Sequence, residues 1–309
     1  MEDFHPQKPK LIEHKPKGGL SITIFSMVMF VLAFTLLFSD QIIFILFLLA
    51  VLLIHELGHY LLMKKFNYKH VRMLFIPLMG AFVQGKKESY SQKESFLVTM
   101  AGPIPGVAVG ILLLLYAANN HSAWGLQLSA LFILLNVINL LPLDPLDGGQ
   151  MFKLFVRKNH EFFLLVFAFL SSLMLIFIGW YINSYLLIVF GFFMGFRVRG
   201  LQKNYQMHKD LNTEEVDYRT TYKLLTNKDF YKIKQVVLDH TPSLKKFIDQ
   251  VSSDESDPVL ASQVNSVLIT PVKRDASKLF KLFVILFWLA SFAVPIYLIF
   301  TLDFTWYEL

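Results

Sequence analysis

Seven apolar runs, most of them long enough to cross a lipid bilayer, dominate this 309-residue sequence. A helix needs about 20 consecutive apolar residues to span the hydrocarbon layer. The chain is 55% hydrophobic and only 17% charged, which is too apolar for an ordinary soluble domain. We therefore expect an α-helical multi-span membrane protein with about seven transmembrane helices. The runs are Leu20–Phe38, Gln41–Phe66, Phe96–Tyr116, Leu126–Leu141, Phe162–Gly179, Tyr185–Phe196 and Leu282–Phe300.

The basic residues are distributed unevenly around these runs. If the N-terminus is cytoplasmic, the outer segments are 39–40, 117–125, 180–184 and 301–309, and none contains Lys or Arg. Cytoplasmic segments of membrane proteins carry an excess of Lys and Arg. The pattern predicts a multi-pass protein of the cell membrane, with the N-terminus cytoplasmic and the C-terminus outside. The net charge of +6 then reflects topology, and we expect no nucleic-acid partner.

The polar segments set the expected domain organisation. Residues 1–19 are expected to form a cytosolic tail, followed by a membrane domain over 20–196 that holds a catalytic core at about 40–155. Residues 197–278 are expected to form a small, mostly helical cytosolic segment, with "SSDESDP" as a linker-like break. Residues 279–309 would supply the last transmembrane helix and a short outer tail.

The stretch Tyr68–Glu94 is apolar but too broken to cross the membrane. It contains "VRMLFIPLMGAFVQG", in which Gly80 and Gly85 are turn points. Irregular backbone at membrane depth is tolerated where protein surrounds it. We expect a β-hairpin that enters the protein from the cytoplasmic side.

Ionisable groups end the second apolar run, in "IHELGHYLLMKKF". His55 and His59 are four residues apart, so they share one face of a helix, and Glu56 follows the first histidine. H-E-x-x-H on a helix is the pattern in which both imidazoles bind zinc and the glutamate acts as general base. The alternative is a helix end whose polar residues reach the interface. There is no cysteine, so any metal must use His, Asp or Glu.

A zinc site needs a third protein ligand, and the best candidate is Asp147 in "NLLPLDPLDGG". His55 lies about 20 Å from the outer end of its span, at 1.5 Å per residue. Asp147 lies just past the fourth run, so both come to the cytoplasmic third of the membrane. Asp147 is otherwise a turn or N-cap residue. Asp144 is an alternative ligand, a hydrogen-bond acceptor for a ligand histidine, or a turn residue.

"HELGH" joined to "NLLPLDPLDGG" resembles the site-2 protease family of intramembrane zinc metalloproteases. That family pairs an H-E-x-x-H helix with a later N-x-x-P-x-x-P-x-D-G motif. The segment "AGPIPG" at 101–106 is similar to the family's A-G-P segment, and "IPLMGAFVQG" to its membrane-embedded β-hairpin. The matching positions of the later motif are Asn139, Pro142, Pro145, Asp147 and Gly148.

The resemblance implies a role for each matched residue. His55, His59 and Asp147 would bind one Zn²⁺ per chain, Glu56 would be the general base, and Asn139 would support the substrate or the oxyanion. The hairpin around Ile76–Val83 would hold an extended substrate strand by β-addition, with contributions from Pro77, Gly80 and Ala81.

We therefore expect a zinc-dependent intramembrane endopeptidase with its active site near the cytoplasmic side. Its partners would be the lipid bilayer and a membrane protein or peptide substrate. Two alternatives remain open. One is a catalytically silent zinc-binding membrane scaffold or sensor, against which the intact Glu56 argues. The other is a membrane protease that matures a small secreted peptide.

Overall fold

The computed structural model describes residues 5–12, 19–37, 41–77, 80–156 and 159–306. The chain divides into two compact units. The first, called the core unit, comprises Pro16–Lys87, Ser91–Arg157 and Arg274–Leu309. The second, called the α7–α11 unit, comprises Met1–Lys15, Glu88–Tyr90 and Lys158–Lys273.

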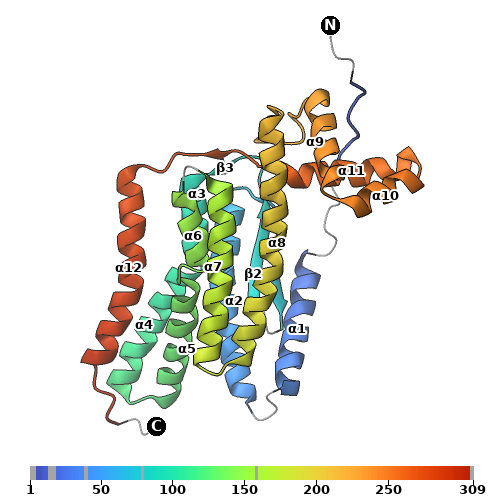
Figure 1. The fold of residues 1–309 in the computed structure, drawn as a ribbon. Coiled ribbons are helices and arrows are strands. Elements are labelled where there is room, and N and C mark those ends of the chain that lie inside the picture. The colour runs from blue at the N-terminus through green and yellow to red at the C-terminus, as the bar shows by residue number, and fades with distance from the viewer. Residues whose placement is uncertain (1–4, 13–18, 38–40, 78–79, 157–158, 307–309) are drawn as a thin grey trace. The chain divides into compact units, whose positions relative to one another are not determined.

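The core unit is mostly helical and carries one β-hairpin (Figure 1). Its elements are α1 (Gly19–Leu37), α2 (Ile42–Lys65), β1 (Lys69–Ile76), β2 (Gly80–Lys86), α3 (Gln92–Met100), α4 (Pro103–Asn120), α5 (Ala123–Asn139), α6 (Asp147–Phe155) and α12 (Lys278–Thr301).

Local sequence explains where several of these helices begin. Ser91 caps α3 by accepting a hydrogen bond from the backbone of Glu94, the pattern S-x-x-E typical of helix starts. Ser122 caps α5 in the same way. α4 begins with Pro103, which has no N–H to leave unsatisfied in the first turn.

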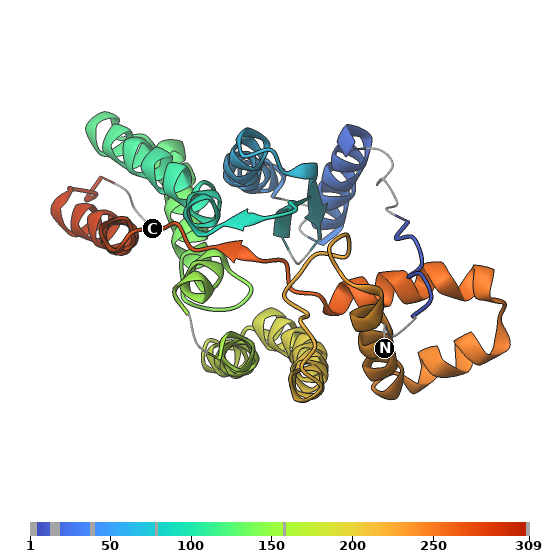
Figure 2. The same cartoon turned by 90° about the horizontal axis from the view of Figure 1, so that it is seen from above.

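α2 lies in the middle of the core unit, between α4 and the hairpin (Figure 2). It packs against β1 and β2 and against α3, α4 and α5. The hairpin is antiparallel, with Met73 opposite Val83 and Phe75 opposite Ala81. Helix α1 lies along β1, where Thr23 donates to the Met73 carbonyl at 2.7 Å and Ser26 accepts from the Phe75 N–H at 3.1 Å. α1 therefore covers the outer edge of β1.

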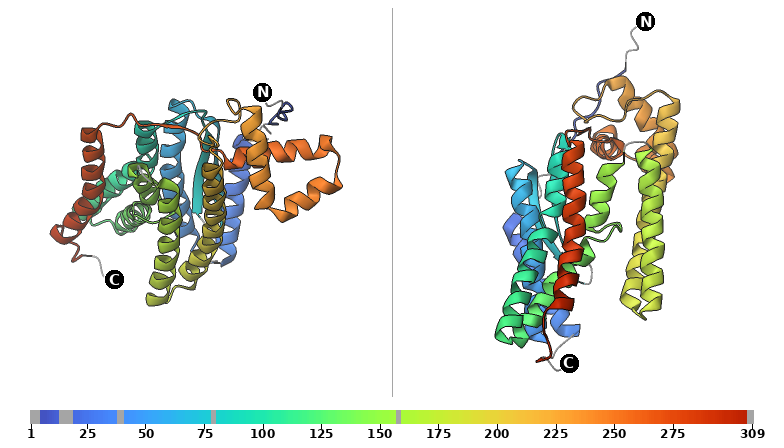
Figure 3. Two further views of the ribbon diagram at one scale, coloured as in Figure 1. Left: turned by 45° about the horizontal axis from the view of Figure 1, so that its top comes forward. Right: turned by 90° about the vertical axis from the view of Figure 1, so that its left-hand side faces the viewer.

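The α7–α11 unit contains α7 (His160–Tyr181), α8 (Tyr185–Thr213), α9 (Asn227–Asp239), α10 (Pro242–Gln250) and α11 (Ser253–Val267). α7 and α8 lie side by side (Figure 3), and Ser172 of α7 donates to the Gly191 carbonyl of α8 at 2.7 Å. Two short strands, β3 (Tyr90–Ser91) and β4 (Val272–Lys273), pair with each other.

An apolar cluster centred on α9 holds the polar end of the α7–α11 unit together. It joins Phe230 and Ile233 of α9 to Leu211 of α8 and Val264 of α11. The N-terminal segment also packs here, through Leu11. The expected linker-like break at "SSDESDP" is wrong, because these residues form the first half of α11. The apolar face of α11 packs against the cluster, and this tertiary contact overrides the weak local helix propensity.

Within the described residues, six helical stretches are long and apolar enough to cross a membrane, by length and composition. They are 19–37, 42–65, 92–120, 160–181, 185–213 and 278–301, while the shorter apolar helix is α5 with 17 residues. These elements confirm a helical multi-pass membrane protein, while the exact number of spans stays a prediction. The expected division at residues 196–197 falls inside α8, which runs unbroken to Thr213.

Candidate metal centre

Two histidines of α2 form one side of the candidate site. His55 and His59 lie one helical turn apart on the face of α2 that is turned into the core unit, and both are buried. Their Nε2 atoms are 3.2 Å apart. Both side chains come from the same helix face, as the four-residue spacing predicts.

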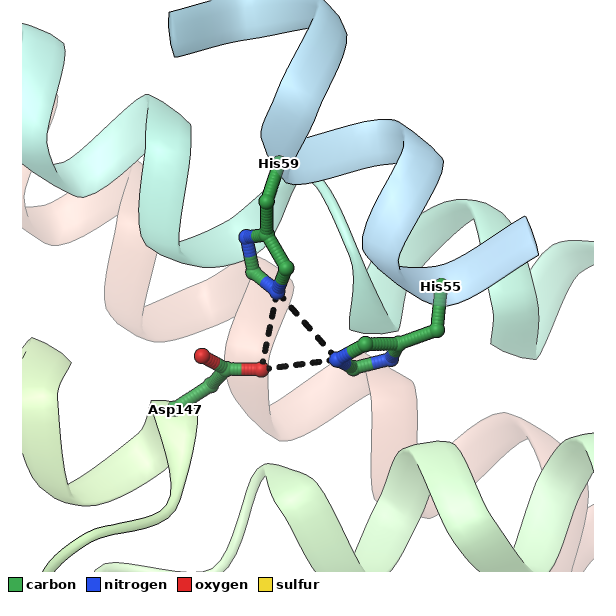
Figure 4. Close-up of side chains that lie close together, drawn as sticks. All are labelled: His55, His59 and Asp147. Carbon is green, nitrogen blue, oxygen red and sulfur yellow. Dashed lines mark hydrogen bonds and ion pairs between the residues drawn. The ribbon is translucent and has the colours of Figure 1, made fainter. Parts of the chain in front are cut away.

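Asp147 completes the cluster from the start of α6. Its Oδ2 atom lies 3.1 Å from Nε2 of His55 and 3.2 Å from Nε2 of His59 (Figure 4). Its depth in the membrane and the resemblance to the site-2 protease motif both predict Asp147 as the partner of the histidines, and the structure brings all three together. Each offers one atom with a lone pair to the same point, which is the arrangement that a metal ion needs.

The spacing of these three atoms fits a small tetrahedral cation. Zinc binds imidazole nitrogen and carboxylate oxygen at about 2.0–2.2 Å, so neighbouring ligand atoms of a tetrahedron lie about 3.3 Å apart. The three observed separations are 3.1, 3.2 and 3.2 Å. Three ligand atoms also leave the fourth position of a tetrahedron open, as in catalytic zinc sites. Two imidazoles and a carboxylate are a donor set suited to zinc.

The other ring nitrogens are bonded in a way that fixes both tautomers. Nδ1 of His55 lies 2.7 Å from Oδ1 of Asn136, and Nδ1 of His59 lies 2.7 Å from the Val98 carbonyl. Both partners are acceptors, since Asn136 uses its amide nitrogen to donate to the Phe132 carbonyl at 2.7 Å. Each Nδ1 therefore carries the proton, and each Nε2 presents its lone pair to the site.

Sequence reasoning missed Asn136 and assigned a role to Asn139, one turn further along α5. Asn136 is fully buried, with 0% of its surface exposed, and it contacts a candidate ligand directly. Asn139 is half-buried at the end of α5, and its proposed role toward the substrate stays a prediction. A lone amide inside an apolar run was the available signal, because such a residue needs a buried hydrogen-bond partner.

Close packing by glycine shapes the walls of the site. A Cβ on Gly102 would lie 2.3 Å from Nε2 of His59 and 2.9 Å from Nε2 of His55. A Cβ on Gly58 would lie 1.9 Å from the Ala101 carbonyl, so α2 touches the α3–α4 junction directly. A Cβ on Gly106 would lie 2.2 Å from the side chain of Asn136. Gly102 and Gly106 of the third apolar run thus permit close packing at the site.

Glu56 is buried beside the cluster, with 5% of its surface exposed. Val83 of β2 lies close to its carboxylate. The hairpin is therefore next to the candidate base. The other expected hairpin residues lie further along: Pro77 follows β1, Gly80 begins β2 with a φ of 94°, and Ala81 pairs with Phe75. Residues 78 and 79 lie outside the described part of the chain.

Comparisons with known proteins agree with this geometry. Residues 43–132 match Peptidase family M50. A zinc metalloprotease of Methanocaldococcus jannaschii is 30% identical over 126 residues, which are 39% of this chain and 36% of that protein. Stage IV sporulation protein FB of Bacillus subtilis is 33% identical over 119 residues, which are 37% of this chain and 41% of that protein. The matched regions thus span less than half of these relatives.

Among solved structures, the chain is similar to a site-2 protease from Methanocaldococcus jannaschii. The TM-score is 0.45 at 21% identity, and the match covers 57% of this chain and 87% of that one. The family match confirms the resemblance to the site-2 proteases for the region that contains "HELGH".

Proposed function

We propose that this chain is a membrane zinc metalloprotease that hydrolyses peptide bonds in or near transmembrane segments. The observation that carries the proposal is the convergence of three buried lone pairs beside Glu56. Nε2 of His55, Nε2 of His59 and Oδ2 of Asp147 lie within 3.2 Å of one another. The M50 match and the relative that is named a zinc metalloprotease support the same reaction class.

Zinc held by these residues would polarise the scissile carbonyl and lower the pKa of a bound water. The remaining chemistry belongs to the protein. A carboxylate oxygen of Glu56 accepts a proton from the attacking water and later delivers it to the leaving amine. Asn136 and the Val98 carbonyl keep both imidazoles oriented, because each holds one Nδ1–H.

Because α1 covers the outer edge of β1, an extended substrate would add to the edge of β2. In an antiparallel pair, opposite residues alternate between those that bond each other and those whose N–H and C=O point outward. The backbone groups of Met73 and Phe75 point outward to α1, so the backbone groups of their partners Val83 and Ala81 point outward from β2. Val83 also lies close to Glu56. A substrate strand added to β2 would therefore pass directly beside the base.

Cells that express the Glu56→Gln variant test the function. If the proposal is correct, the variant protein accumulates in the membrane with its zinc retained, and membrane-bound precursors that the wild type cleaves accumulate with it. Quantitative comparison of the two membrane proteomes identifies these precursors. Processing that continues at the wild-type rate in purified Glu56→Gln membranes would exclude Glu56 as the base and favour the silent scaffold.

A proline at position 81 tests the β2 edge. The Ala81→Pro change removes an outward-facing N–H, so we expect cleavage of a transmembrane substrate to fall about tenfold, the loss of roughly one net hydrogen bond. Bound zinc should stay at the wild-type level. The matched control is Phe82→Ala, since Phe82 is 40% exposed and its N–H points toward β1. Equal cleavage by Ala81→Pro and Phe82→Ala would contradict the use of this edge.

The proposed topology places the N-terminus and the site's opening on the cytoplasmic side. Helix α2 then runs inward and ends with Lys64 and Lys65, which suit the cytoplasmic boundary. The basic-residue pattern and the depth of the ligands along α2 support this orientation. The segments at 117–125 and 301–309 would face outward.

A further inference from the structure

Asp144 lies three residues before the candidate ligand Asp147, yet it is not part of the cluster that His55, His59 and Asp147 form. It is 2% exposed and forms an ion pair with Lys153, at the end of α6. Gln150 donates to the same Asp144 oxygen at 3.3 Å and to the Pro145 carbonyl at 3.3 Å. Lys153 also donates to Gln150 at 3.4 Å. Three side chains thus tie the 144–146 loop to the helix that follows it.

This arrangement surrounds the start of α6, where Asp147 sits. Gln150 and Lys153 come one and two turns after Asp147 in α6. Their hydrogen bonds to Asp144 therefore join the helix to the loop on the other side of Asp147. The other side of that turn is fixed by close packing. A Cβ on Gly148 would lie 2.0 Å from the Leu140 carbonyl, and one on Gly149 would lie 2.2 Å from the Leu143 carbonyl.

We propose that Asp144, Lys153 and Gln150 are positioning residues that hold α6 in the orientation from which Asp147 reaches both histidines. The inference rests on the proposed metal site and adds residues that do not touch the metal. It also accounts for Asp147, and not Asp144, being the candidate ligand, because the Asp144 carboxylate is paired with Lys153.

A purely structural role does not explain this choice of residues. Burying an ion pair costs much of the energy that it returns, so apolar side chains of similar volume often stabilise a fold as well or better. The pair joins residues only nine apart. The ion pair fixes the start of α6, which is the segment that carries the candidate ligand Asp147. Partners of this kind typically change metal affinity by about 10–100-fold.

Cobalt binding to the purified full-length chain tests the proposal without requiring turnover. Co²⁺ affinity, measured by chelator competition, and the visible spectrum of the bound ion report the position of Asp147. The main variant is Asp144→Asn/Lys153→Met, which removes both charges and leaves no unpaired one. We expect its thermal stability to match the wild type, its cobalt affinity to fall about tenfold and its spectrum to change.

Three further variants complete the test. Lys153→Arg keeps the charge and should retain wild-type affinity, whereas Lys246→Met removes an exposed charge from α10 and should change nothing. Gln150→Met leaves the ion pair intact, so it keeps the test valid if the double variant fails to fold. We expect it to weaken cobalt binding about threefold. Wild-type affinity and spectrum in a folded double variant, or in Gln150→Met alone where the double variant does not fold, overturn the inference. Failure of the wild type to bind cobalt would instead overturn the proposed metal site.

Discussion

The two units of the molecule each bury histidine, and they bond it in opposite ways. In the core unit, His55 and His59 each satisfy one nitrogen locally and direct the other to a shared point with Asp147. In the α7–α11 unit, His208 is 5% exposed and directs its two nitrogens to two different acceptors. Nδ1 faces Glu161 at 3.0 Å, and Nε2 faces the Val267 carbonyl at 2.8 Å.

This difference separates a site from a structural cluster. The His208 ring also stacks on Tyr218, with ring centres 4.4 Å apart, and the Tyr218 hydroxyl donates to Glu161 at 3.1 Å. The ring thus lies among α7, α8 and the end of α11 without facing a second histidine or a shared point. A buried histidine is therefore no sign of a metal site by itself. What marks the core unit is that lone pairs of three side chains converge on one point.

The largest expected effect comes from Gly102, because a methyl group there enters the space between the ligands. A Cβ would lie 2.3 Å from Nε2 of His59 and 2.9 Å from Nε2 of His55, so both ligand rings would have to move. Gly102→Ala should abolish zinc binding and cleavage while the protein still enters the membrane. Zinc content after purification is the measurement. Gly195→Ala is the control, since its Cβ would meet nothing closer than 3.7 Å. A Gly102→Ala protein with full zinc content would show that the site lies elsewhere.

The next effect comes from Asn136, which holds the His55 imidazole by one hydrogen bond. Asn136→Leu removes the acceptor for Nδ1–H and leaves the ring free to change tautomer. Zinc affinity should fall about 10–100-fold, the usual range for such partners. Competition with a chelator measures the change. An unchanged zinc affinity would mean that the ring is held by packing alone.

The smallest effect on metal binding comes from His208, and it sharpens the comparison. His208→Leu should leave zinc affinity unchanged, because this ring directs no lone pair to a shared point. It should lower the free energy of unfolding by about 1–3 kcal/mol, since Glu161 and the Val267 carbonyl lose their partner. Thermal unfolding with and without a chelator measures both quantities. A loss of zinc in this variant would break the distinction drawn between the two units.

The sequence predicted the residues of the site better than the contacts that support them. Helical spacing places His55 and His59 on one face, and the direction of each span brings Asp147 to the same depth. Both arguments use only local periodicity and the thickness of the bilayer. The partners at Nδ1 depend on tertiary packing. The Val98 carbonyl is a backbone group, so no residue type in the sequence indicates its bond to His59. Whether Asn136 or Asn139 contacts His55 depends on the rotation of α5 about its axis.

The same limit explains the misassigned features. His208 shows no ligand spacing in the sequence, and nothing local indicates its burial, but it lies on the buried face of α8 with Met207 and Leu211. The burial of His208 depends on tertiary packing, in which Glu161 of α7 and the Val267 carbonyl of α11 face its ring. Asp144 had three open interpretations, and only the ion pair with Lys153 decides among them. A charge pair such as Asp144–Lys153 can be predicted only when the geometry of the loop before α6 is known.

The central claim is that His55, His59 and Asp147 hold one zinc ion beside Glu56. The most direct measurement is the zinc content of the purified full-length chain by elemental mass spectrometry. The wild type and Glu56→Gln should each carry one zinc per chain, because Glu56 is not a ligand in this arrangement. His59→Ala should carry less than about a tenth of that amount, since it removes one of three protein ligands. A wild-type chain without zinc, or a His59→Ala chain that retains it, would contradict the account.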